Sequence, residues 1–170
     1  MKTGPAKNRS MRLVTPSSQA GAIAVELAFV MVVMLLIVAG MIGFGRAFWY
    51  ADALTKATRD GARLMSTWEV SGTPPGISAT GVLAAQTITR NGANAANVSP
   101  PLGTAGTNVL VECLTVTFAV VDCAAEAPAN VKVSITDFNV SLGQWFPFIG
   151  TSGVILPIRL SPHTTMRYMN

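Results

Sequence analysis

The most apolar part of the chain is a run of 23 residues, Ala22–Phe44, in which Glu26 is the only charged residue. As an α-helix this run would rise about 35 Å, which is enough to cross the roughly 30 Å hydrocarbon core of a bilayer. The run is also longer than the apolar core of a secretory signal peptide, and removal after the run is therefore the weaker interpretation. The pattern predicts a transmembrane helix.

After this run the pattern becomes two-sided at helical spacing. One side carries the small and apolar residues Ala47, Tyr50, Leu54, Ala57, Gly61, Leu64 and Trp68. The other side carries Asp52, Lys56, Arg59, Asp60 and Arg63, and Asp52 and Lys56 have the spacing of a favourable ion pair. We expect one helix over residues 22–68, with 22–44 in the membrane and the rest in water, ended by the Gly and Pro residues of 72–76.

Charge is distributed unevenly along the chain. The four basic residues before Gly21 are Lys2, Lys7, Arg9 and Arg12, with no acid among them, whereas the remainder has eight basic and eight acidic residues. The positive-inside rule places a basic leader, residues 1–21, in the cytoplasm and the C-terminal part outside it. Arg46, Trp49 and Tyr50 suit the far membrane interface, with lipid as partner. The sequence contains no basic stripe interleaved with aromatic residues, so it does not support nucleic-acid binding.

Residues 69–107 are rich in Gly, Ala, Asn, Thr and Pro and are expected to form a loop-rich linker. A second helix is predicted within it over Ala79–Arg90, through Val82, Leu83, Gln86 and Ile88, although Gly81 interrupts it and the pattern has no strong apolar stripe. The sequence RNGANAAN that follows has the composition of a loop.

The region 108–170 has the alternation of β-strands. In Asn108–Val121 one face would carry Leu110, Leu114, Val116, Phe118 and Val120, and in Asn130–Val140 one face would carry Val131, Val133 and Ile135. These two segments predict a hairpin, and Val154–Leu160, with Pro157, predicts an edge strand. A small antiparallel sheet packed on the water-exposed half of the long helix gives an α+β, pilin-like fold.

Cys113 and Cys123 are the two cysteines of the chain. Outside the cytoplasm they would form a disulfide that stabilises the small sheet by about 2–3 kcal/mol, and the alternative is a pair of free cysteines in the core. A single histidine, His163, excludes a metal site made of several histidines, and no catalytic grouping is recognisable. We therefore expect no metal, no cofactor and no enzymatic activity.

Glu26 is the residue that most needs an explanation, because a carboxylate inside a membrane costs a few kcal/mol. Its position near the start of the run also fits a protonated or snorkelling side chain without a role. However, a basic leader, Gly21, four small or apolar residues and Glu26 together resemble the type IV prepilin signal. That resemblance implies cleavage between Gly21 and Ala22 by a membrane prepilin peptidase. The new amine of Ala22 would then pair with Glu26 of a neighbouring subunit and set the register between helices.

The resemblance extends over Gly21–Trp68 to the TadE-like family of tight-adherence pilus proteins. Phe44–Ala47 reads FGRA and Arg59–Arg63 reads RDGAR, as in that family, whereas Leu27 replaces its usual aromatic residue. It implies a minor pilin or pseudopilin that supports assembly of an adhesive pilus. The implied location is the bacterial inner membrane, with a periplasmic C-terminal domain. The implied partners are the prepilin peptidase, other pilins and the inner-membrane assembly platform.

A second hypothesis is a membrane-anchored extracytoplasmic binding protein with one transmembrane helix. Its discriminating feature would be an exposed apolar patch, for which Trp145, Phe146 and Phe148 are the candidates, although packing in the core is the favoured explanation for them. A membrane-tethered enzyme is disfavoured because no catalytic grouping is present.

Overall fold

The computed structural model describes residues 19–103, 108–140 and 158–169. The chain divides into two compact units, residues 1–38 and 39–170. Helix α1 runs without a break from Gln19 to Ser66, in agreement with the helix expected over 22–68. A small antiparallel β-structure follows it along the chain, which confirms the α+β class.

In the first unit the described residues are the start of α1. The side chains from Gly21 to Val38 are exposed on every side of the helix, and apart from Glu26 all of them are apolar or small. A helix that is hydrophobic all round needs an apolar environment, either a membrane or a protein core.

In the second unit α1 is amphipathic, as its two-sided pattern predicts. Tyr50, Leu54, Ala57, Ala62 and Met65 are buried, whereas the charged residues of the other side are exposed. The expected pair is present, with Lys56 Nζ 2.7 Å from Asp52 Oδ2.

Helix α2 extends from Ala79 to Ala95 and begins where the sequence predicts. The Ser78 side chain caps it by accepting a hydrogen bond from the Gly81 N–H. The prediction of a loop directly after Arg90 was wrong, because the helix continues for five residues. Asn94, inside that extension, hydrogen-bonds both the N–H and the C=O of Leu102, a tertiary contact that local composition does not reveal.

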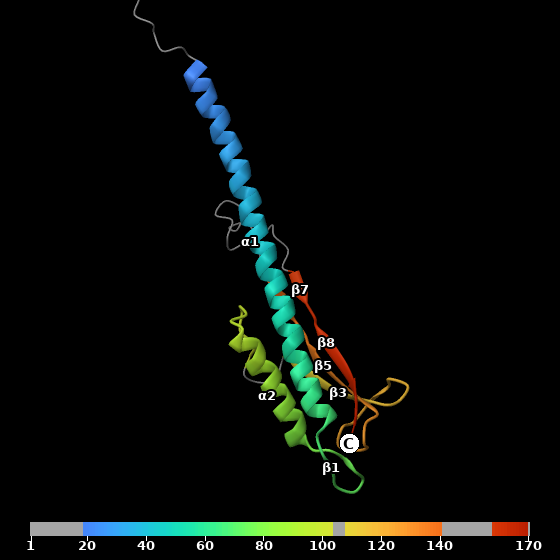
Figure 1. Ribbon diagram of the computed structural model, residues 1–170. Helices are drawn as coiled ribbons and strands as arrows, with labels where there is room; N and C mark the ends of the chain where they lie inside the picture. Colours follow the sequence, from blue (N-terminus) through green and yellow to red (C-terminus); the bar gives the residue numbers. More distant parts are fainter. Residues whose placement is uncertain (1–18, 104–107, 141–157, 170) are drawn as a thin grey trace, which may run out of the picture. The chain divides into compact units, whose positions relative to one another are not determined.

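The buried side of α2 also differs from the prediction, since Leu83 and Ile88 are exposed. The buried residues are small and recur every four positions: Gly81, Ala85, Thr89 and Ala93. A Cβ on Gly61 of α1 would lie 3.2 Å from the Ala85 carbonyl oxygen and would collide with the Thr89 hydroxyl. In the second unit α1 and α2 therefore lie side by side at close range (Figure 1).

The main sheet has four antiparallel strands in the order β4-β3-β5-β8. They are β3 (Val109–Leu114), β4 (Val120–Val121), β5 (Asn130–Ile135) and β8 (His163–Arg167). The predicted hairpin is confirmed by β3 and β5, with Cys113 opposite Val131. The sequence prediction did not include β8, which pairs with β5 along its whole length. Two further two-stranded sheets are β1 (Val70–Ser71) with β2 (Gly76–Ile77), and β6 (Phe138–Val140) with β7 (Ile158–Leu160).

The predicted apolar face of the first strand was wrong except at Leu114, which is buried. Strand β3 ends at Leu114, and a turn follows in which the Thr115 hydroxyl accepts hydrogen bonds from the N–H groups of Thr117 and Ala119. Val116 and Phe118 are consequently exposed. Strand β3 buries Val109, Cys113 and Leu114, whereas Leu110 of the predicted face is exposed.

The predicted second strand, 130–140, is interrupted. Strand β5 ends at Ile135, and Asp137 has a φ of 57°, so the chain leaves the main sheet and continues as β6. The inward face of β5 is as predicted, with Val131, Val133 and Ile135 all buried. The predicted edge strand is present in its last three residues as β7, whereas its first part, with Pro157, lies outside the described residues.

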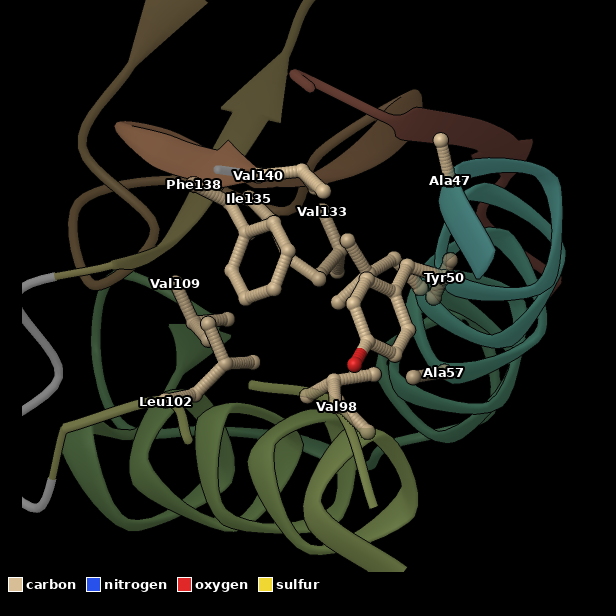
Figure 2. Close-up of a cluster of buried hydrophobic side chains, with 13 residues drawn as sticks. Ala47, Tyr50, Ala57, Val98, Leu102, Val109, Val133, Ile135, Phe138 and Val140 are labelled. Carbon is tan, nitrogen blue, oxygen red and sulfur yellow. The ribbon is translucent and has the colours of Figure 1, made fainter. Parts of the chain in front are cut away.

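The core of the second unit lies between the helices and the sheet. Tyr50 of α1 meets Phe138 of β6 edge to face, with ring centroids 6.2 Å apart. Val109, Val133 and Ile135 surround this pair from the sheet (Figure 2). Small side chains on the helices allow these large ones to fill the space between the layers.

Candidate functional site

The start of α1 holds the three residues that the sequence singles out. Gly21, Ala22 and Glu26 all lie in the helix and are exposed. Ala22 and Glu26 are one turn apart, so they share a side of the helix. Nothing lies within 4 Å of a Cβ built on Gly21, which leaves this backbone open to an external protein.

Glu26 has no hydrogen-bond or ion-pair partner among the described residues. Its neighbours on the helix are apolar and exposed, among them Phe29 and Val30 one turn away. A carboxylate in such surroundings is stabilised in an apolar medium only by protonation or by a partner that brings a positive charge. No described residue supplies that positive charge, so the partner has to come from outside the described part of the chain.

Among the described helices, α1 alone is long and apolar enough to cross a membrane, and its most apolar window is unburied. This places Glu26 in the first turns of a membrane-type helix and indicates a membrane-anchored protein. The predicted peptidase and register roles of Gly21, Ala22 and Glu26 are not tested by this geometry.

The residues predicted for the far interface have different environments. Trp49 is 61% exposed, and its indole N–H donates to the Ala96 carbonyl oxygen at 3.3 Å. Arg46 donates to the Tyr50 hydroxyl at 2.7 Å and lies 5.7 Å from that ring's centroid. Tyr50 itself is only 5% exposed, so its ring belongs to the core rather than to the surface. The interfacial role stays a prediction for Arg46, Trp49 and Tyr50.

Cys113 and Cys123 form a disulfide, with Cα atoms 5.2 Å apart. The bond joins β3 to the segment after β4, and the Cys113 side chain is completely buried. The Cys123 carbonyl oxygen also accepts a hydrogen bond from the Ile77 N–H at 2.7 Å, so the same segment fastens β2.

The described residues contain no group of three or more His, Cys, Asp or Glu side chains arranged to hold a metal ion. His163 is exposed on β8. Trp145, Phe146 and Phe148, the candidates for an apolar binding patch, lie outside the described residues. The feature that sequence reasoning missed is β8, whose five residues form an edge of the main sheet.

Comparison with protein families gives a match to the TadE-like protein family over residues 21–63. The matched segment begins at Gly21, includes Ala22 and Glu26, and continues into the amphipathic part of α1. No curated protein and no solved structure matches the chain. The match confirms the TadE-like resemblance over these residues. Proteins of that family are pilus-associated and of a structural, non-enzymatic kind, and in this chain the matched segment includes the candidate membrane helix.

Proposed function

We propose that this protein, whose residues 21–63 match the TadE-like family, is a minor pilin or pseudopilin of a tight-adherence pilus. A prepilin peptidase cleaves it between Gly21 and Ala22, and the mature subunit supports assembly of the pilus used in surface adherence. The observation that carries the proposal is the exposed, unpaired Glu26 one turn after Ala22 at the start of a membrane-type helix.

Cleavage would create a positive amine at Ala22, one turn from Glu26. In an assembly of axially staggered helices, the amine of one subunit meets the carboxylate of the next. Each charge then has a partner in a medium of low dielectric constant, where an unpaired charge is costly. Pairing thereby favours one register between subunits and offsets the free-energy cost of placing the Glu26 carboxylate in the membrane span.

The proposed location is the bacterial inner membrane, with the N-terminus in the cytoplasm and residues 45–170 outside it. The basic leader supports this orientation, and the disulfide fits an oxidising compartment. The proposed partners are the prepilin peptidase, other pilins, the assembly platform and membrane lipid.

The first experiment measures intact mass and N-terminal sequence of the protein extracted from membranes of cells with and without the prepilin peptidase. A new N-terminus at Ala22 that requires the peptidase is expected. Gly21→Leu should remove cleavage, whereas Gly40→Leu is the matched control, because a Cβ at either position has open space. A chain that keeps its original N-terminus in both strains contradicts the proposal.

A second experiment separates the pilin from a plain anchor. Glu26→Leu should be cleaved and inserted normally, yet reduce the amount of sheared pili at least tenfold, because the amine of Ala22 loses its partner. Glu69→Leu, which removes an exposed carboxylate outside the apolar run, is the control and should assemble normally. Normal pili with Glu26→Leu would favour the membrane-anchored binding protein instead.

A further inference from the structure

Strand β8 forms one edge of the main sheet. It pairs with β5 from Asn130↔Arg167 to Ser134↔His163, and no described segment pairs with its other side. An open edge of this kind presents unpaired backbone N–H and C=O groups to any strand that approaches it.

The hydrogen bonds at both ends of β8 show which groups face outward. The Ile135 N–H donates to the Pro162 carbonyl oxygen at 2.9 Å, and the Tyr168 N–H donates to the Ala129 carbonyl oxygen at 3.0 Å. Antiparallel pairs alternate between bonded and non-bonded positions, so Thr164 and Met166 are the residues of β8 that bond to β5. The backbone groups of His163, Thr165 and Arg167 therefore point away from the sheet.

The two edges of the sheet are not equally protected. Strand β4, at the opposite edge, has only two residues, and very short edge strands rarely accept a partner. Strand β8 has five residues, contains no proline, and turns the uncharged Thr164 and Met166 toward the helices. The Thr164 hydroxyl lies 2.9 Å from that of Thr58 in α1. This contact is on the face of β8 that is turned toward the helices, so it does not occupy the outer edge of the strand.

We propose that the outer edge of β8 binds an extended segment of a partner protein by strand addition, with an acidic side chain of that segment beside Arg167. Three N–H and three C=O groups at two-residue spacing match an extended polypeptide backbone. Arg167 is exposed and has no ion-pair partner in the described chain, and Glu112 of β3, two strands away in the same sheet, is bound to Lys132 at 2.7 Å. The inference rests on the second unit alone and does not require the pilin assignment.

A second copy of the chain is a poorer occupant. If two β8 strands paired about Thr165, each Arg167 would lie opposite the partner's His163, and neither copy supplies an acidic side chain on this strand. Charge complementarity therefore favours a different protein over a symmetric dimer.

The test uses the full chain in detergent micelles and a fluorescein-labelled peptide of sequence SVTVEVT as the probe. Saturable binding by fluorescence anisotropy is expected. Thr165→Pro should weaken it at least tenfold, since proline removes an outward N–H without breaking a bond to β5. Thr165→Val, which keeps that N–H, should bind within twofold of wild type. Replacing the probe's Glu by Lys should weaken binding to wild type but not to Arg167→Gln.

A probe N-methylated on alternate amides should not bind, because it cannot complete the ladder. Equal binding of the methylated probe, or of Thr165→Pro, would overturn the proposal. So would a dimer in analytical ultracentrifugation that Thr165→Pro dissociates, because the occupant would then be a second copy. If the near-ultraviolet circular dichroism of Thr165→Pro shows that it is unfolded, the methylated probe on wild-type protein decides the question.

Discussion

Leu36 and Leu54 lie in the same helix, α1, but they belong to the two different compact units of the chain. Leu36 is 45% exposed, whereas Leu54 is fully buried. The chemistry of the two residues is identical, and only their surroundings differ. Leu54 is covered by its own unit, whereas no described residue covers Leu36.

The polar residues of the two regions differ in the same way. Glu26 lies alone in an apolar stretch, and Asp52 and Lys56 pair with each other on an exposed face. A charge in water gains little from a partner, but a charge in a membrane needs one. The comparison teaches that the chain itself covers and pairs the second half of α1, whereas the apolar side chains and Glu26 of the first half stay exposed among the described residues.

The largest effect should come from shortening Leu54, and the same change at Leu36 is its control. Leu54→Ala removes a fully buried side chain and should lower the free energy of unfolding of the domain by about 2–5 kcal/mol. Leu36→Ala should change it by less than about 0.5 kcal/mol, since exposed substitutions have small effects. Denaturant titration in micelles, followed by near-ultraviolet circular dichroism, measures both. Similar losses of stability for the two variants would contradict the conclusion that Leu54 is part of a core and Leu36 is not.

Removing the disulfide should affect only the second region. Replacing Cys113 and Cys123 together by Ser should lower the free energy of unfolding by about 2–3 kcal/mol, because the unfolded chain regains the freedom of the closed loop. Resistance to carbonate extraction from membranes should be unchanged. Reduction of the wild type with dithiothreitol should give a similar loss, and its absence would show that the bond is not formed in cells.

The glycines of α1 give a third contrast. Gly61→Ala places a methyl group against Thr89 and the Ala85 carbonyl and should destabilise the domain by about 1–3 kcal/mol. Gly45→Ala adds the same methyl group in open space, so the same unfolding measurement should show unchanged or higher stability. Destabilisation by both would mean that Gly45 also lies against another helix.

The smallest effect concerns the exposed pair. Lys56→Ala should cost about 0.3–0.5 kcal/mol at low salt and less at 0.5 M salt, since the pair lies in water. A double-mutant cycle with Asp52→Ala measures the coupling. A coupling energy above about 1 kcal/mol would show that the pair is more desolvated than its exposure indicates.

Several elements could be predicted because their causes are local. The long helix and the β3–β5 hairpin follow from apolar length, helical period and alternation along the strands. The buried sides of α2 and β3 could not be predicted in the same way. In α2 the contact surface consists of small residues that carry little hydrophobic signal, and in β3 the turn at Thr115 ended the strand early.

The sequence alone determined that residues 22–44 suit a membrane, that Glu26 is the exception there, and that the next turns are two-sided. These properties depend on composition and on helical period, which neighbours in the chain determine. Only the tertiary structure decided that Tyr50 is a core residue, that α2 approaches Gly61 closely, and that β8 forms an open edge. Those outcomes depend on which surfaces meet, and contacts between distant segments are not encoded in local periodicity.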